Sequence, residues 1–239
     1  MMRWKSAAAT HPGCVRSVNQ DAFLDRPDLG LWAVADGMGG HAAGERASAL
    51  VVETLARLPS PRFLGRSTEQ LESLIQEANR QLIAEAAAKG DEIIGTTLVA
   101  LLALGGACAL LWVGDSRIYR LREGRLTQLT TDHTEVQQWV AQGMLSPDEA
   151  DAHPHANVLS RAIGAEDELQ IDTAIDSLHP GDRYLLCSDG LSKELSRERI
   201  GALLASGAPT ETVQQLIETT CEAGARDNVT ALVIEFSVV

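Results

Sequence analysis

The sequence predicts a mixed fold in which antiparallel β-sheet is covered by α-helices. Apolar, strand-like runs recur along the chain, and long segments with helical periodicity separate them. In addition, the run Ala109–Val113 passes through Gly114, Asp115 and Ser116 into Arg117–Leu121, where polar and apolar residues alternate. A Gly- and Asp-containing turn between two such runs is typical of a β-hairpin, so we expect antiparallel pairing at this point.

Four strand-like runs have an aspartate at one end. They are Leu31–Ala35 before Asp36, Ala109–Val113 before Asp115, Tyr184–Cys187 before Asp189, and Val229–Phe236 after Asp227. A further apolar run, Leu98–Leu104, stops at Gly105 and Gly106 and predicts a strand that enters a turn. We therefore expect at least five strands, four of them ending or beginning at a carboxylate.

Helical segments are also recognisable. Ser67 and Gln70 have the spacing of a capping box, apolar residues follow at helical intervals from Leu71 to Leu82, and Gly90 marks a stop. Three more helices are expected at Gly44–Leu58, Ser196–Ser206 and Thr210–Ala223. Between Thr134 and Asn157 the pattern predicts a helical excursion: a short helix around Val136–Val140, a stop at Gly143 and a new start at Ser146.

Composition excludes several classes of protein. Apolar residues make up 45% of the 239 residues, enough for a sizeable core, and 33 acidic against 20 basic residues give a formal charge of −13. That sign argues against nucleic acid as a partner. No apolar run approaches the ~18 residues of a membrane span and no signal-peptide core is present, so we expect a cytoplasmic protein. The four cysteines are scattered, which favours free thiols.

The aspartates at strand ends suggest a metal centre. A single aspartate in a turn is usually a turn residue, because its carboxylate hydrogen-bonds nearby backbone amides. Four aspartates at strand ends instead favour a metal site, because hard divalent cations prefer several oxygen ligands and strand ends can bring carboxylates together. Glycines beside Asp36 and Asp189 let the backbone approach an ion or a phosphate closely.

Eight blocks in this sequence resemble, in order, those of the type 2C metal-dependent protein phosphatases (PPM family) in their short bacterial form. The blocks are Arg16–Asp21, Asp36–His41, Gly95–Thr97, Gly114–Arg117, Asp132–Thr134, Leu159–Gly164, Ser188–Leu191 and Asp227–Thr230. They cover nearly the whole chain. Small departures from the family pattern at Gln20, Thr134 and Ser160 remove no ligand and leave the expected activity intact.

The resemblance implies an α+β fold: a four-layer αββα sandwich with two central antiparallel β-sheets flanked by helices. It implies one phosphatase catalytic domain over residues 1–239, and it identifies the helical excursion as a flap segment at about 133–160. The activity implied is metal-dependent hydrolysis of phosphoserine and phosphothreonine in proteins. Two ions ~3.5–4 Å apart would lower the pKa of a bridging water and hold the resulting hydroxide in line with phosphorus.

The resemblance also implies roles for individual residues. Asp36 would bridge two Mn²⁺ or Mg²⁺ ions, and Asp189 and Asp227 would complete the ligand set, with a backbone oxygen from Gly37. Other residues around the two ions have further implied roles. Asp21 would hold water from the second shell, and Asp115 with Asp189 would form a weaker third ion site. Arg16 would clamp the substrate phosphate, His41 would be the general acid, and Asn228 would support Asp227.

Other readings remain open at the level of the sequence. A phosphoprotein-binding module with weak catalysis, or a phosphatase of small metabolites, could use the same fold. We expect a monomer that acts on phosphorylated proteins and opposes a separate bacterial Ser/Thr kinase. His133 is expected to orient the start of the flap segment, His153 and His155 lack a third ligand for a metal, and Ser188 lacks the flanking glycines of a nucleophile elbow.

Overall fold

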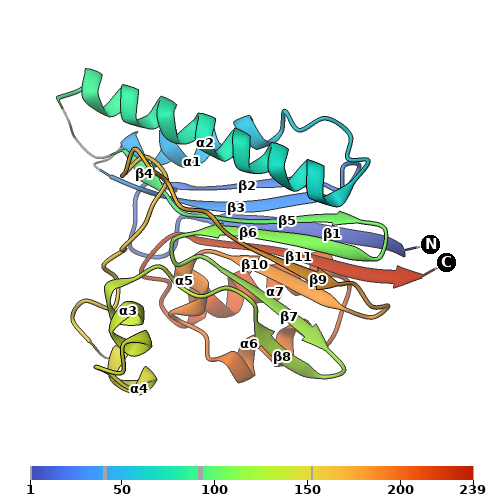
Figure 1. The fold of residues 1–239 in the computed structure, drawn as a ribbon. Coiled ribbons are helices and arrows are strands. Elements are labelled where there is room, and N and C mark those ends of the chain that lie inside the picture. Colours follow the sequence, from blue (N-terminus) through green and yellow to red (C-terminus); the bar gives the residue numbers. More distant parts are fainter. Residues whose placement is uncertain (1, 40–41, 91–93, 152, 239) are drawn as a thin grey trace.

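The computed structural model describes residues 2–39, 42–90, 94–151 and 153–238, and Figure 1 shows two β-sheets stacked face to face between helices. The first sheet has the antiparallel order β1-β11-β10-β7-β8. Its strands are β1 (Met2–His11), β11 (Val229–Val238), β10 (Arg183–Cys187), β7 (Arg117–Arg122) and β8 (Arg125–Gln128). The first and last strands of the chain are therefore direct neighbours.

The second sheet has the antiparallel order β2-β3-β5-β6-β9, with a short strand β4 paired to the end of β3. Its strands are β2 (Asp21–Arg26), β3 (Leu31–Met38), β4 (Gly95–Thr96), β5 (Leu98–Leu104), β6 (Ala107–Val113) and β9 (Asp172–Ser177). The turn at Gly105 and Gly106 joins β5 to β6, as the sequence predicts.

Helices cover the outer faces of both sheets. The helices α1 (Ala42–Leu55) and α2 (Leu64–Ala88) pack on the second sheet, and α7 (Pro209–Glu222) packs on β1 and β11 of the first. The short helices α5 (Asp189–Ser192) and α6 (Arg197–Leu204) lie on the same side as α7, whereas α3 (Glu135–Ala141) and α4 (Pro147–Asp151) stand apart at one end (Figure 1). The expected four-layer α+β sandwich is confirmed.

Apolar side chains fill each of the three interfaces between layers. The interface between the sheets contains Trp32, Tyr184 and Phe236, all without solvent exposure, with ring centroids of neighbouring pairs 5.4 to 6.2 Å apart in edge-to-face contact. One further cluster lies between the second sheet and α1 and α2, and another between the first sheet and α6 and α7. Each sheet is thus buried on both faces, which explains the long uninterrupted apolar runs in their central strands.

The predicted hairpin across Gly114–Ser116 is wrong. β6 pairs with β5 and β9 in the second sheet, whereas β7 pairs with β10 and β8 in the first, so the connection carries the chain from one sheet to the other. Gly114 has φ +101°, and a Cβ there would meet the side chain of Thr97 at 2.6 Å. A sharp Gly-Asp turn therefore serves equally well to connect two stacked sheets, and the pairing partner is decided by tertiary packing.

The expected helices are present, with corrected bounds. α2 begins at Leu64 rather than at a Ser67 cap: Ser67 is buried within the helix, and its N–H donates to the Phe63 carbonyl at 3.0 Å. α1 ends at Leu55, three residues before the expected end. The helices at α6 and α7 and the two of the flap segment lie within about two residues of their expected positions, and Gly90 and Gly143 follow their helices with positive φ.

Candidate active site

Aspartates from both sheets meet at one end of the sandwich. Asp36 lies in β3, and Asp115 lies in the connection between β6 and β7. One residue separates Asp189, which opens α5, from the end of β10, and one residue separates Asp227 from the start of β11. All four line one pocket of about 510 Å³. Because β3 belongs to one sheet and β10 and β11 to the other, the stacking of the two sheets brings these carboxylates together.

Two threonines hold the backbone of Asp36. The Thr96 hydroxyl donates to the Asp36 carbonyl at 2.8 Å, and the Thr97 N–H donates to the same oxygen at 2.8 Å. In return the Asp36 N–H donates to the Thr97 hydroxyl at 3.2 Å. Thr96 and Thr97 thus anchor both the N–H and the carbonyl of Asp36, the residue whose carboxylate lines the pocket.

Asp21 lies behind the pocket and joins the two sheets. It sits opposite Asp36 in the β2-β3 pair, and its Oδ2 accepts hydrogen bonds from the hydroxyls of Ser188 and Thr230, both at 2.7 Å. The Thr230 N–H donates to the Ser188 hydroxyl at 3.0 Å. This buried network ties the second sheet to the residues that precede Asp189 and follow Asp227, and it gives Ser188 a structural partner.

Asn228 fixes the loop that carries Arg16. Its amide donates to the carbonyls of Pro12 and Val18, both at 2.9 Å, and its oxygen accepts the Gln20 N–H at 2.8 Å. The Asn228 N–H also donates to the Asp227 carboxylate at 2.9 Å. The Asp227 carboxylate is therefore supported by the main-chain N–H of Asn228, whereas the Asn228 side chain holds the loop before β2 against the start of β11.

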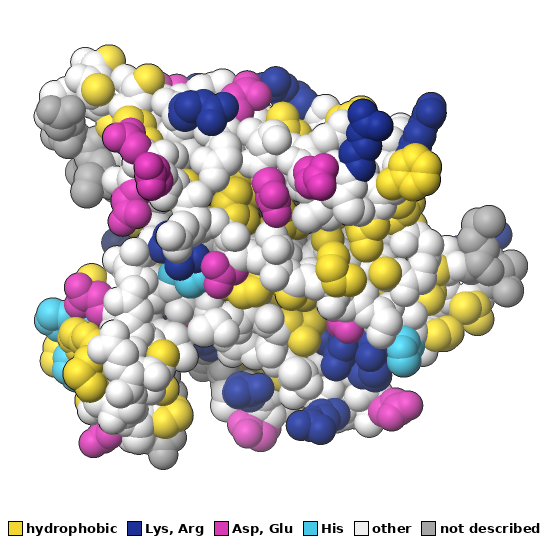
Figure 2. Space-filling model, viewed as in Figure 1, with side chains coloured by type: hydrophobic (Ala, Val, Ile, Leu, Met, Phe, Trp, Pro, Cys, Tyr) yellow, Lys and Arg dark blue, Asp and Glu magenta, His cyan; other side chains and the backbone are white. Residues whose placement is uncertain are grey.

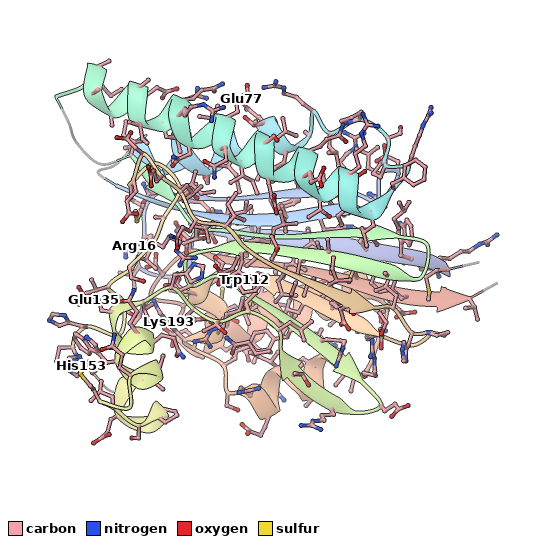
Figure 3. The ribbon with its side chains drawn as sticks, in the orientation of Figure 1. Arg16, Glu77, Trp112, Glu135, His153 and Lys193 are labelled. Atoms are coloured by element: carbon pink, nitrogen blue, oxygen red, sulfur yellow. The ribbon has the colours of Figure 1, made fainter. Side chains whose placement is uncertain are left out.

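Two basic side chains form ion pairs with the aspartates of the pocket. Arg16 makes a bidentate pair with Asp227, Nε at 3.0 Å and Nη2 at 2.8 Å, with both side chains about half exposed. Lys193 pairs with Asp189 and lies 3.7 Å from Asp115 Oδ2. Figure 3 shows Arg16 and Lys193 at the same end of the sandwich. The sequence reasoning missed Lys193, although its position four residues after Asp189 is a recognisable signal for an ion pair on a helix.

Burial and mutual repulsion make this carboxylate group costly to ionise. The pKa of Asp36 is raised well above its usual range by burial and then by the charges of Asp21 and Asp189. Burial, with a smaller contribution from Asp189, raises the pKa of Asp115 to about 7. The pKa of Asp21 rises to about 6, again mainly through burial, although hydrogen bonds from Thr230 and Ser188 oppose the shift. Such a cluster has a strong electrostatic preference for added positive charge.

The residues present fit divalent cations. Asp21 Oδ1 and Asp189 Oδ1 are buried and without a hydrogen-bond partner among the described residues, so both oxygens are available as acceptors. The donor set is carboxylate oxygen and backbone carbonyl, which Mg²⁺ and Mn²⁺ favour. Within the ranges that the structure describes, no three acidic, His or Cys side chains already stand at metal-ligand spacing. Asp189 and Asp227 are paired with Lys193 and Arg16 instead.

Close backbone packing at the pocket requires glycine at two positions. A Cβ on Gly37 would come within 2.1 Å of the Gly44 carbonyl oxygen, and one on Gly190 would come within 2.0 Å of the Asn228 carbonyl oxygen. Larger residues would push α1 away from β3 and α5 away from the turn before β11. The glycines adjacent to Asp36 and Asp189 therefore allow α1 to pack closely on the end of β3, and α5 to pack closely on the turn before β11.

His133 holds the start of the flap segment, as expected. Its Nδ1 accepts the Gly114 N–H at 3.0 Å, and its Nε2 lies 3.2 Å from Asp172 Oδ2. Burial lowers its pKa, and the charge of Arg161 lowers it further. His153 and His155 lie on the flap segment, where His155 pairs with Glu135 at 2.7 Å; Figure 3 labels Glu135 and His153 at this end of the protein. His41, the expected general acid, lies outside the described residues.

Comparison with known proteins identifies the class to which this fold and pocket belong. Residues 15–232 match the family described as protein phosphatase 2C, and the chain belongs to this family. It is 40% identical to the serine/threonine protein phosphatase PstP of Mycobacterium tuberculosis over 96% of the chain, and the chain spans 44% of the length of that relative. The resemblance that the sequence blocks indicate is confirmed.

Solved structures give the same result. The chain superposes with a TM-score of 0.92 and 41% identity on PppA, described as a key regulatory component of the T6SS in Pseudomonas aeruginosa, with 98% of each chain covered. It superposes with a TM-score of 0.88 and 37% identity on the catalytic domain of PstP in complex with two manganese ions, with 100% of each chain covered.

Proposed function

We propose that this protein hydrolyses phosphoserine and phosphothreonine in other proteins and depends on two Mn²⁺ or Mg²⁺ ions. The observation that carries the proposal is the pocket of about 510 Å³ at the sandwich end, where four aspartates from both sheets lie beside Arg16. Two further facts support it: the chain belongs to the protein phosphatase 2C family, and the structurally similar PstP domain holds two manganese ions.

The proposed ligands are those that the family resemblance implies, and the placement of the four aspartates in one pocket supports them. Asp36 lies at the centre of the group and is assigned to both ions, with the Gly37 carbonyl oxygen beside it. Asp189 and Asp227 are assigned to complete the set, Asp115 with Asp189 to a weaker third ion, and Asp21, which lies behind Asp36, to water held in the second shell. Divalent cations in such a site activate water for attack on phosphorus and neutralise charge on the phosphoryl oxygens.

Arg16 is assigned to the substrate phosphate. The bidentate pair that it makes with Asp227 shows that its guanidinium reaches the carboxylate group from the pocket rim. Two phosphoryl oxygens present nearly the same geometry as a carboxylate, so the same fork can hold a phosphate. Asn228 serves this role indirectly, because it holds the loop on which Arg16 is carried. His41 is assigned as the acid that protonates the departing serine or threonine oxygen.

The two alternative functions make different predictions. A binding module would retain phosphoprotein without turnover, and a metabolite phosphatase would prefer small phosphate esters to peptides. We therefore measure kcat/KM on phosphothreonine, phosphoserine and phosphotyrosine peptides and on a panel of sugar phosphates, all in Mn²⁺. Fast hydrolysis of the first two peptides supports the proposal. Comparable rates on phosphotyrosine peptides, or a preference for sugar phosphates, would show that the substrate class is wrong.

We also propose the setting in which the protein acts. The substrates are phosphorylated proteins, a separate Ser/Thr kinase adds the phosphate, and the protein is a cytoplasmic monomer with one catalytic domain and a flap segment at about 133–160. No helix in the described parts of the chain is both long and apolar enough to cross a bilayer. A phosphoproteome comparison of cells with and without the gene tests this setting, because substrates gain Ser/Thr phosphorylation when the gene is deleted.

A further inference from the structure

A second cavity adjoins the catalytic pocket beneath the flap segment. It has a volume of about 380 Å³ and shares Asp115, Asn157, Asp189 and Lys193 with the catalytic pocket. Figure 2 shows the flap segment standing off from the rest of the protein on the left, and Figure 3 places Lys193 on the side that faces it. The two spaces are therefore adjacent compartments of one depression that opens beside the aspartates.

The wall opposite the flap segment is formed where α5 passes into α6. Ser192 and Lys193 come from the end of α5, and Ser196 and Arg197 come from the start of α6. A polypeptide with its phosphorylated residue in the catalytic pocket continues in both directions from that point, at ~3.3 Å for each extended residue. A residue two to four positions away thus lies ~7–13 Å from the phosphorylated one, within reach of this wall.

Most charges around the second cavity already have partners. The Asp132 carboxylate accepts three hydrogen bonds from Arg117, at 2.7 to 3.1 Å, and both side chains are mostly buried. Asp115 and Asp189 lie at the end shared with the catalytic pocket, where Lys193 pairs with both. These acidic groups therefore contribute little net negative charge to the far end of the cavity.

Arg197 is the exception. Among the described residues it forms no ion pair or side-chain hydrogen bond, and it is exposed to solvent at the first position of α6. The pKa of the adjacent Glu198 is lowered mainly by hydrogen bonds from its own backbone amide and from Ser196, and Arg197 makes only a smaller contribution. The far end of the second cavity thus has an available guanidinium with the Ser192 and Ser196 hydroxyls near it.

We propose that this second cavity binds an acidic side chain of the substrate polypeptide, an Asp or Glu close in sequence to the phosphorylated residue, and that Arg197 is its anchor. The inference rests on the proposed function and adds a sequence preference to it. A carboxylate on Arg197 gains a charge-assisted pair. A basic side chain would instead face Arg197 and Lys193 and be repelled, and a neutral one would gain no ion pair.

The test uses phosphothreonine peptides, each of which carries a single Glu or its neutral isostere Gln. This residue stands at one of the four positions before or one of the four positions after the phosphothreonine. We compare kcat/KM in the wild-type protein, in Arg197→Ala and in the matched control Arg199→Ala. Arg199 lies on the same helix and is also exposed, but it lines neither cavity. At one or two positions we expect Glu to exceed Gln by about three- to fivefold in the wild type and in Arg199→Ala, mainly through KM.

In Arg197→Ala this ratio of Glu to Gln peptides falls to about one, in Arg197→Glu it falls below one because the Glu peptide is repelled, and hydrolysis of p-nitrophenyl phosphate is unchanged in every variant. The proposal is overturned when no position shows a Glu preference, or when Arg199→Ala loses the preference to the same extent as Arg197→Ala. Hydrolysis of the aryl phosphate without hydrolysis of any peptide would instead contradict the proposed function itself, and the subsite with it.

Discussion

Replacing Asp36 by Asn should stabilise the protein in a metal chelator while abolishing its activity. Asp36 and Asp21 face each other in the β2-β3 pair, and Asp115, Asp189 and Asp227 also raise the pKa of Asp36. Without bound cations these carboxylates repel one another, so the folded state is under electrostatic stress that asparagine would relieve. Function and stability thus oppose each other at this residue.

The size of the effect follows from the geometry of the pair. Directly opposed residues in an antiparallel pair have Cβ atoms ~5 Å apart, at which two charges repel by ~3 kcal/mol at an effective dielectric constant near 20. Because partial protonation already relieves part of this repulsion, we expect Asp36→Asn to gain ~1–3 kcal/mol. That gain corresponds to a rise of ~3–9 °C in Tm for a domain of this size.

The effect also has a definite dependence on pH. A carboxyl whose pKa is higher in the folded than in the unfolded state binds more protons when folded, so its stabilising contribution is present at low pH. This contribution is lost as pH rises from the unfolded value of 3.8 through the folded values of about 6 for Asp21 and about 7 for Asp115. In chelator, the wild-type Tm should therefore fall from about pH 5 to about pH 7.5, and that of Asp36→Asn should fall less.

The assay is thermal unfolding by circular dichroism in excess chelator at both pH values. Asp28→Asn is the matched control, because it removes the same charge from an exposed site where Arg26 lowers the pKa of the carboxyl. Asp28→Asn should give no rise in Tm. An equal rise in Tm in both variants would show that the gain comes from the net charge of −13 rather than from the pocket. A Tm of Asp36→Asn below that of the wild type at pH ~7.5 would refute the reasoning.

Variants at Asn228, Asp182 and His41 give three other predictions, the first two from hydrogen bonds in the structure and the third from the role that the family resemblance implies for His41. Asn228→Ala removes three hydrogen bonds that hold the Arg16 loop. The value of kcat/KM on a phosphothreonine peptide should therefore fall about tenfold, and amide hydrogen exchange over residues 13–19 should become faster. Unchanged exchange would contradict this role of Asn228. Asp182→Ala leaves the partly buried Arg122 without its bidentate partner and should cost ~3 kcal/mol in urea unfolding, and a cost under ~1 kcal/mol would show that the pair is dispensable. His41→Ala should lose ~10²–10⁴ in kcat on a phosphothreonine peptide and much less on p-nitrophenyl phosphate, whose leaving group needs little protonation; equal losses would remove His41 from its role.

Sequence patterns predict local features of this fold well and long-range pairing poorly. Gly90 and Gly143 mark helix ends because positive φ is a local property of glycine. By contrast, the chain after Gly114 enters the opposite sheet, because β7 finds its partner in β10, more than 60 residues later. No local pattern in the sequence contains that information. β1 was not predicted either, since its side chains are mostly half-buried and its pairing partner β11 is at the other end of the chain.

In the candidate site, too, local features are predictable from the sequence and contacts between distant segments are not. The aspartates at strand ends were recognisable one by one, and family resemblance gathered them into one site, which the structure places in one pocket. Thr96, Thr97 and Thr230 lie in blocks that resemble the family, but their contacts were not predicted, because they act through hydrogen bonds between segments far apart in the sequence. The i,i+4 pair of Lys193 with Asp189 is a local signal, but the approach of Lys193 to Asp115 is not, because Asp115 comes from the distant connection between β6 and β7.

The most direct test of the account is a Mn²⁺ titration of phosphate release from a phosphothreonine peptide by the wild type and by Asp36→Asn. The account predicts no release in chelator, saturable activation of the wild type by Mn²⁺ and at most residual activity in Asp36→Asn at any Mn²⁺ concentration. Thermal unfolding of the same samples should show that Mn²⁺ stabilises the wild type far more than the variant. Full activity of the wild type in chelator, or equal activation of both proteins, would contradict the claim that these carboxylates act by holding cations.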